Sequence, residues 1–172
     1  TGIYNCALGL NCLALNKNGS ANVALGSSAL LYNINGNNNT AVGNNAGINI
    51  GNNEKAISEC SSNVAIGNNA MTGYYTNLCQ CVAIGSLALG DNLSKLNTDI
   101  LIENNIAIGY ATSYSSNGSF NSCIGAFSNY NNTGSNNIMF GYDTLYSTTP
   151  FNTEDSTYIG NYILPIDEIK NE

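Results

Sequence analysis

Large apolar and small residues alternate in short segments that recur along the chain. Residues 22–30 run Asn, Val, Ala, Leu, Gly, Ser, Ser, Ala, Leu, and close copies begin at Asn39, Asn63 and Asn105. Nine copies in one register place glycines at Gly9, Gly26, Gly43, Gly67, Gly85, Gly109, Gly125, Gly141 and Gly160. The numbering interval between successive glycines is 17, 17, 24, 18, 24, 16, 16 and 19. Repeats of this length indicate a solenoid, in which each coil stacks on the next.

Within each copy the alternation has a period of two, which is typical of a β-strand. Val23 and Leu25 fall on one face of the strand and Ala24 on the other. We expect the large apolar side chains to point into the coil, and the small face to pack closely against another layer. A second short strand, such as residues 28–30, is expected after the glycine. A polar return loop rich in Asn and Gly then closes the coil.

The glycine that ends each strand recurs in all nine copies, so each copy needs it for the same geometrical reason. Only glycine takes a positive φ without steric cost, which predicts a sharp turn there. Close approach of a neighbouring backbone is the alternative. The asparagines that head the copies are expected to form a ladder of side-chain amides, interrupted at Cys81 and Ser156. These asparagines are Asn5, Asn22, Asn39, Asn63, Asn105, Asn121 and Asn137.

These patterns predict an all-β fold, a parallel β-solenoid of about nine coils of roughly 16–24 residues each. The repeat domain is expected over residues 1–162, and residues 163–172 are expected to be a C-terminal cap or linker. Two longer coils carry insertions, between Ala46 and Asn63 and between Leu89 and Asn105, that hold much of the charge. Extra residues leave a solenoid as loops on one face, so both insertions are expected on the same side.

Composition narrows the possible partners. Apolar residues make up 43% of the chain and charged residues only 9%, while asparagine is the commonest residue type. The net charge of −7, with only four basic residues, argues against a nucleic-acid partner. No apolar run approaches the roughly 18 residues that a membrane-spanning helix needs, so no membrane insertion is expected.

The residues that most enzymes use are scarce. There is no histidine, which excludes Ser-His-Asp and Cys-His arrangements and the usual zinc spacings. No catalytic residue, metal site or cofactor is therefore expected. The six cysteines do not form a known motif, and Cys123 stands where most copies have alanine, so a small buried thiol is expected, with a disulfide as the alternative. Asp99 and Glu103 are the one pair of carboxylates that would suit glycoside hydrolysis.

Aromatic residues gather in the C-terminal half, where 11 of the 15 lie from Tyr110 onward. Tyr114, Tyr130 and Tyr146 each stand at the fifth position after a repeat glycine, so they recur once per coil. In coils of equal length they are expected to form a column with a spacing of ~4.8 Å. Two interpretations stay open: the column seals the turn beside the core, or it is a ligand contact for a sugar or protein receptor.

The units at residues 39–46 and 63–67 resemble the head repeats of trimeric autotransporter adhesins. They are even more similar to the repeats of tail-fibre and surface-fibre proteins of phages and large DNA viruses. The resemblance covers about residues 3–164. It implies a left-handed parallel β-roll assembled as a homotrimer, with the small Ala and Gly faces near the threefold contact. It also implies a projecting fibre that attaches to a host surface.

The sequence therefore predicts a non-enzymatic structural and attachment segment of a homotrimeric fibre. The expected location is extracellular, on a cell surface or on a virion surface. The partners expected are other copies of the chain and a glycan or protein receptor on the host. One alternative is a filament subunit that polymerises by stacking coils between chains, since the end coils of a solenoid are open to pairing. The other is a carbohydrate-active β-helix enzyme.

Overall fold

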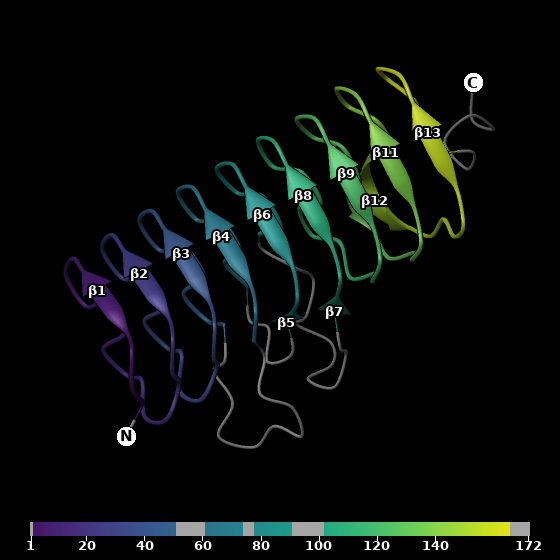
Figure 1. The fold of residues 1–172 in the computed structure, drawn as a ribbon. Helices are drawn as coiled ribbons and strands as arrows, with labels where there is room; N and C mark the ends of the chain where they lie inside the picture. The colour runs from purple at the N-terminus through teal and green to yellow at the C-terminus, as the bar shows by residue number, and fades with distance from the viewer. Residues whose placement is uncertain (1, 51–60, 74–77, 91–101, 166–172) are drawn as a thin grey trace.

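The chain forms a β-solenoid whose nine repeats each contribute one strand to a single parallel sheet (Figure 1). The structure is a computed structural model that describes residues 2–50, 61–73, 78–90 and 102–165. The strands of this sheet are β1 (Cys6–Leu8), β2 (Val23–Leu25), β3 (Thr40–Val42), β4 (Val64–Ile66), β6 (Val82–Ile84), β8 (Ile106–Ile108), β9 (Ser122–Ile124), β11 (Ile138–Phe140) and β13 (Thr157–Ile159). Equivalent residues of neighbouring repeats pair without a shift, so the predicted solenoid and its register are confirmed.

Two short parallel pairs lie on the other side of the coils. β5 (Leu78–Cys79) pairs with β7 (Ile102–Glu103). β10 (Tyr130–Asn132) pairs with β12 (Tyr146–Phe151), and the register shifts between residues 130 and 132. The predicted second strand directly after the glycine was wrong, because residues 27–32 form turns. In that segment Ser28 and Leu30 have φ angles of 57° and 50°, and this left-handed conformation bends the chain away from an extended path.

The direction of the strand side chains was also predicted wrongly. In β2, Ala24 is 1% exposed and points inward, while Val23 and Leu25 are 40% and 42% exposed. The same order repeats along the sheet, where the middle residue of each strand from β2 to β11 is buried and its two neighbours are more exposed. The coil is too thin to hold a large side chain from both of its walls, and the wall opposite the sheet supplies the large ones.

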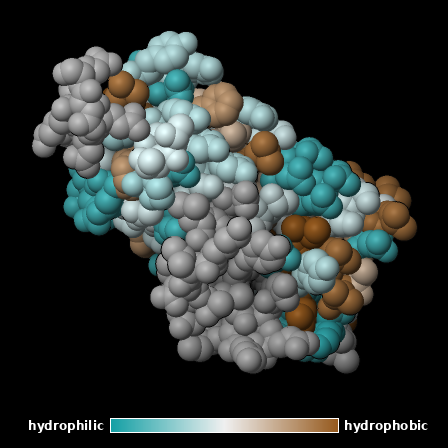
Figure 2. Space-filling model, turned by 180° about the vertical axis from the view of Figure 1, so that it is seen from behind, coloured by the Kyte–Doolittle hydropathy of each residue, from teal (hydrophilic) through white to brown (hydrophobic). Residues whose placement is uncertain are grey.

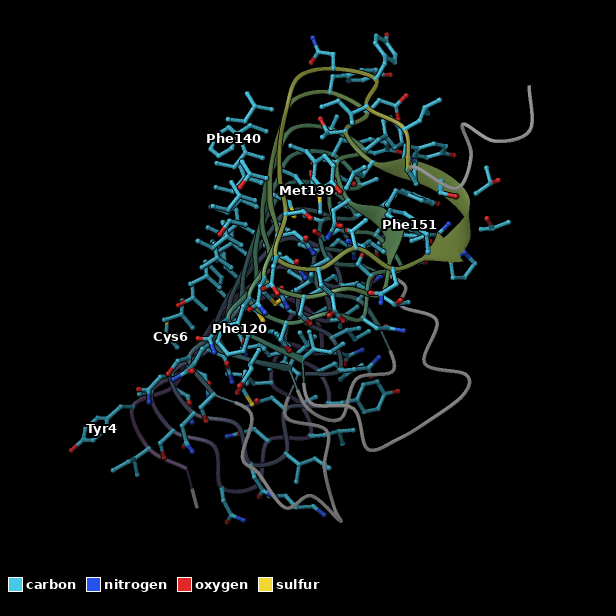
Figure 3. All side chains as sticks on the ribbon, turned by 90° about the vertical axis from the view of Figure 1, so that its right-hand side faces the viewer. Tyr4, Cys6, Phe120, Met139, Phe140 and Phe151 are labelled. Atoms are coloured by element: carbon cyan, nitrogen blue, oxygen red, sulfur yellow. The ribbon has the colours of Figure 1, made fainter. Side chains whose placement is uncertain are left out.

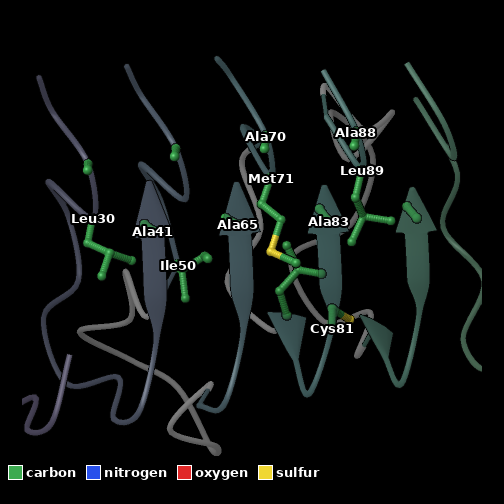
Figure 4. Packing of buried hydrophobic residues seen from close by; sticks show 14 of the residues in the cluster. Leu30, Ala41, Ile50, Ala65, Ala70, Met71, Cys81, Ala83, Ala88 and Leu89 are labelled. Atoms are coloured by element: carbon green, nitrogen blue, oxygen red, sulfur yellow. The ribbon is translucent and has the colours of Figure 1, made fainter. Parts of the chain in front are cut away.

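Figure 4 shows this division of the core: Met71 and Leu89 reach from the opposite wall toward the strand alanines Ala65 and Ala83, and Leu30 lies beside the preceding strand alanine. All five of these side chains are at most 1% exposed. A second, smaller core cluster further along contains Cys123, Met139 and Leu145, against which Ile163 packs. The core therefore runs as a narrow column along the solenoid, as expected for a repeat protein.

Buried asparagines join the coils, as the sequence predicted. The side-chain Oδ1 of Asn22 accepts the backbone N–H of Asn39 at 2.9 Å, and its Nδ2 donates to the Gly36 carbonyl across the same coil at 2.9 Å. The backbone bond to the preceding asparagine recurs through the ladder. At Cys81 and Ser156 the ladder lacks the asparagine side chain, but their backbone N–H groups still donate to the Oδ1 atoms of Asn63 and Asn137, at 3.0 and 3.2 Å. Each asparagine thus closes its own coil and fixes the next.

Candidate functional site

The repeat glycines were predicted as structural turns, and all nine have a positive φ, between 127° and 148°. Gly67 shows why no other residue fits. A Cβ built there would lie 2.5 Å from the carbonyl oxygen of Gly85 in the next coil. The Gly67 N–H meanwhile donates to the Val42 carbonyl of the preceding coil at 2.8 Å. Both sequence explanations therefore hold at Gly67, because the turn and the close backbone approach occur together.

The outward side chains of the nine-stranded sheet form a continuous apolar band, which we call the outer strip. It comprises Cys6, Leu8, Val23, Leu25, Thr40, Val42, Val64, Ile66, Val82, Ile84, Ile106, Ile108, Ser122, Ile124, Ile138, Phe140, Thr157 and Ile159. None of these side chains is charged. Viewed along the solenoid in Figure 3, Phe140 projects outward on this side while Met139 points into the coil.

The size of the outer strip follows from strand geometry. Nine strands of three residues cover roughly 40 Å by 10 Å, or about 400 Å² before side-chain relief is counted. A contiguous apolar patch of this size is comparable to the largest on ordinary monomers, which are often functional. By contrast, Figure 2 shows the opposite face of the molecule, where hydrophilic and hydrophobic residues are interleaved in the part drawn in colour. The outer strip is therefore a candidate interaction surface.

The predicted tyrosine column is present. The Tyr114 and Tyr130 ring centroids are 5.1 Å apart with the planes 19° from parallel, and Tyr130 and Tyr146 are 4.8 Å apart at 42°. All three side chains are half-buried. Because the Tyr130 ring stacks on Tyr114 and packs at a tilt against Tyr146, much of the central ring is covered within the chain itself. The geometry favours the sealing role of the column over ligand contact through its ring faces.

Other aromatic rings beside this column are more exposed, and sequence analysis did not single them out. Tyr110 and Tyr142 are 49% and 45% exposed, and both rings stand nearly perpendicular to Phe127, at centroid distances of 5.2 and 6.2 Å. Tyr162 in turn contacts Tyr142 at 5.4 Å. One signal was available: Tyr110 and Tyr142 each directly follow a repeat glycine, on coils that are separated by one other coil. We call Tyr110, Phe127 and Tyr142 the exposed aromatic group.

Two polar side chains accompany the exposed aromatic group. The Asn161 Oδ1 accepts the backbone N–H of Tyr142 at 2.8 Å. Asp143 adjoins Tyr142 in the turn, and burial raises the pKa of its carboxyl above the ordinary value. The group therefore combines ring surfaces with hydroxyl, amide and carboxylate functions.

The cysteines do not form a reactive centre in the described parts of the chain. Burial raises the pKa of Cys123 to about 12 and that of Cys81 to about 11. Both thiols stay protonated at neutral pH, and a protonated thiol is a poor nucleophile. Cys6, Cys12, Cys81 and Cys123 form no disulfide bond. Cys123 is thus the small buried thiol that the sequence predicted, while Cys60 lies outside the described residues.

The other possible chemistry is limited. Within residues 2–50, 61–73, 78–90 and 102–165 there is no group of three His, Cys, Asp or Glu side chains arranged to hold a metal ion. Asp99 lies outside these ranges, so its pairing with Glu103 stays a prediction. Most of the two predicted insertions, residues 51–60 and 91–101, lies outside them as well, so their common side stays a prediction. No helix capable of spanning a membrane occurs in the same described ranges.

No family model, curated protein or solved structure matches this chain. The function of this chain has to be argued from its own surface, on which the outer strip and the exposed aromatic group are the two candidate interaction sites.

Proposed function

We propose that this chain is a structural and attachment segment of a homotrimeric fibre, extracellular or on a virion surface, without enzymatic activity. The outer strip is the observation that supports the proposal. It is an uncharged apolar band on a chain whose net charge is −7. A second copy offers the same charge-free surface, so association through the strip removes apolar area from water and buries no charge.

The shape of the strip favours three copies around an axis parallel to the solenoid. Its footprint of about 400 Å² is half of the roughly 800 Å² per partner in a typical stable interface. In a threefold arrangement each copy meets two neighbours, so the flanks of the strip contribute area as well. This assignment replaces the expectation that the Ala face lies at the threefold contact, because Ala24, Ala41 and their equivalents are buried inside the coil.

Attachment is compatible with this arrangement. The exposed aromatic group lies on the turns that follow the strands, and the strip lies on the outer face of the sheet. When the strips face the axis, the turns remain at the periphery of the fibre. Assembly and receptor contact then use separate parts of each coil.

Light scattering coupled to size-exclusion chromatography tests the proposal. The unchanged protein is expected to elute with three times the chain mass. Ile66→Lys places a charge in the middle of the strip, where Ile66 is 37% exposed, and is expected to yield folded monomers. Asn68→Lys is the matched control, since Asn68 is exposed in the adjoining turn but outside the strip. A monomeric unchanged protein, or an Ile66→Lys variant that keeps the trimer mass, would contradict the proposal.

A second candidate is the self-assembling filament subunit, and the unshifted parallel pairing of the coils favours it. Equivalent residues of neighbouring coils pair directly, so a coil of one chain can pair with a coil of another chain by the same hydrogen bonds. Mass photometry separates the two functions: one discrete mass supports the trimer, and an open distribution of masses supports the filament.

A further inference from the structure

Phe120 departs from the pattern of the column in which it stands. This leading column holds the residue two positions before each strand of the nine-stranded sheet, and all nine residues have φ between 51° and 63°. They are Tyr4, Ala21, Asn38, Ser62, Gln80, Asn104, Phe120, Asn136 and Asp155. Asparagine and aspartate tolerate this left-handed conformation, whereas it is unfavourable for a bulky side chain. Phe120 is also 51% exposed, so burial in its own chain compensates little of the strain.

The exposed aromatic group lies at the other end of the same strand. Phe120 precedes β9 by two residues, and Phe127 follows it by three. The Phe120 N–H donates to the Glu103 carbonyl at 3.0 Å. The Phe127 N–H donates to the Tyr110 carbonyl at 2.9 Å, so both phenylalanines stand on the coil that follows β8. Figure 3 shows Phe120 near the start of the sheet strands and Phe140 near their ends. Because a strand separates Phe120 from Phe127, the two rings do not meet within one chain.

Phe127 makes the exposed aromatic group a continuous surface rather than a pocket. Its ring packs edge-on against Tyr110 and Tyr142, at 82° and 89° and at centroid distances of 5.2 and 6.2 Å, and so fills the space between them. Tyr146 supports Phe127 at 6.1 Å. Another aromatic side chain can lie on such a surface, since ring pairs are favourable at centroid distances of about 4.5–7 Å.

The two ends of the coils match in character. The trailing column holds the residue after each repeat glycine: Leu10, Ser27, Asn44, Asn68, Ser86, Tyr110, Ala126, Tyr142 and Asn161. On the coils of β2, β3, β4, β6 and β13, both columns carry small or polar residues. The coil of β1 carries Tyr4 and Leu10, and Phe120 leads the coil between those of Tyr110 and Tyr142. The bulky apolar side chains of the two columns therefore lie at matching levels along the solenoid.

Threefold assembly brings the two columns together. In a closed ring each copy uses two different patches, one toward each neighbour. When the outer strips face an axis parallel to the solenoid, the strand ends of one copy lie beside the strand starts of the next. Rotation about that axis does not shift a copy along it, so coils at the same level meet. The leading column of one copy then faces the trailing column of its neighbour, which is the arrangement that matched columns suit.

We infer that the Phe120 ring packs on the exposed aromatic group of the neighbouring copy and fixes the register of the fibre. This inference rests on the proposed trimer and names the side chains that join its edges. The contact covers the side of the group next to the outer strip and leaves the outward side at the periphery, where the attachment proposal places it. The strain at Phe120 is then compensated in the assembled fibre and not in the single chain.

Phe120→Asn is the first test, because asparagine occupies this column in three other coils and suits a φ of 60° better. Sedimentation velocity over a concentration series is expected to show dissociation of the trimer at a roughly tenfold higher concentration than for the unchanged protein, as when a central aromatic contact is lost. In the Ile66→Lys background, expected to be monomeric, the same substitution should leave the melting temperature unchanged or raise it. Gln80→Asn is the matched control on a coil without aromatic flanks and should change neither quantity.

Disulfide trapping tests the register. The double variant Asn136→Cys and Tyr142→Cys places thiols in both columns of the β11 coil, at two exposed positions. Dioxygen with copper phenanthroline takes two electrons and two protons from each thiol pair as the S–S bond forms. Covalent trimers are expected, with the linked peptides identified by mass spectrometry. The mismatched control combines Asn38→Cys with Tyr142→Cys, five coils or ~24 Å apart, and should give no link between these positions.

Three results would overturn the inference while the trimer persists. They are an unchanged trimer dissociation in Phe120→Asn, equal linking in the matched and mismatched cysteine pairs, and a lower melting temperature of Phe120→Asn in the monomeric background. The last result would show that Phe120 serves the folding of its own chain. A monomeric unchanged protein would instead count against the proposed function.

Discussion

Replacing one repeat glycine tests how the coils are held together. In Gly67→Ala, the new Cβ would lie 2.5 and 2.6 Å from the backbone oxygen and carbon of Gly85, at a residue whose φ is +134°. The backbone strain contributes about 1–3 kcal/mol. The two coils must also separate by about 1 Å to restore ordinary contact, since carbon atoms pack at roughly 3.5–4 Å. The bonds from Gly85 N–H to the Ile66 carbonyl and from Leu87 N–H to the Asn68 carbonyl, now 2.8 and 3.0 Å, would weaken.

Each of these two hydrogen bonds contributes about 1 kcal/mol, so the expected total loss is about 3–5 kcal/mol. For a chain of this size the melting temperature should fall by roughly 6–20 °C. Thermal unfolding followed by circular dichroism at several protein concentrations measures this change, and urea unfolding gives the free energy. The concentration series separates a change in folding from a change in association.

Gly160 is the matched control for the steric part of this loss. Its φ is +148°, but the atoms nearest to an added Cβ belong to the Ile163 side chain, at 3.4 and 3.8 Å. Gly160→Ala therefore adds backbone strain without backbone crowding. We expect it to lower the free energy of unfolding by about 2 kcal/mol less than Gly67→Ala does. Equal losses would show that crowding between coils contributes nothing, and an unchanged Gly67→Ala variant would refute the whole argument.

Three further predictions concern individual side chains. The buried hydroxyl of Ser128 has no hydrogen-bond partner, whereas the hydroxyl of the equivalent Thr144 donates to the Gly160 carbonyl at 2.6 Å. In urea unfolding, Ser128→Ala should leave the free energy of unfolding unchanged or raise it, and Thr144→Ala should lower it by about 1 kcal/mol. Iodoacetamide should label Cys12 but not Cys123 in the native protein, and mass spectrometry of the peptides shows this. Burial raises the pKa of Asp143, so this carboxyl binds a proton more readily in the folded protein than in the unfolded chain. The stability that it contributes is therefore present below pH 3.8 and is lost as the pH rises through the folded pKa. Thermal melts over this pH range should show a smaller loss for Asp143→Asn.

Much of the fold could be predicted because a residue that recurs at the same position of every repeat indicates the same backbone conformation or contact in every coil. Nine glycines in one register specified the strand ends, and the asparagine spacing specified the ladder. The recurrence of tyrosine once per coil predicted the column, which has centroid distances of 5.1 and 4.8 Å. In each case, one position on successive coils has to satisfy the same contact.

The recurrence of the repeat could not predict which face of each strand points into the coil. A period of two assigns Val23 and Ala24 to opposite faces, but it does not say which face is inside. Both faces are apolar, so hydrophobicity does not decide between them. The wall opposite the sheet decides, because Leu30 and its equivalents occupy the interior and leave room only for alanine. The turns that place Leu30 there have a non-glycine residue at φ 50°, which sequence propensity disfavours.

The exposed aromatic group was missed for a related reason. Tyr110 and Tyr142 follow the glycines at a position where other copies have Ser27 or Asn44. Whether such a side chain is covered depends on the path of the turn. The two rings form one group because the Phe127 ring, on the coil between them, contacts both, at 5.2 and 6.2 Å.

The outer strip contributes little to the folding of one copy, and its apolar side chains are expected to act in assembly. The interior alanines, the asparagine ladder and the glycine turns hold each coil to the next, and the strip side chains contribute to none of these contacts. β-Propensity alone does not explain the composition of the strip, because threonine suits an exposed strand equally well and stays soluble. Yet only Thr40 and Thr157 among the strip positions are threonine, while valine, isoleucine, leucine and phenylalanine occupy most of the others. An isolated copy leaves these side chains in water and gains little stability from them. Their contribution is realised when another surface covers them, so substitutions in the strip should change the oligomeric mass far more than the unfolding of a single chain.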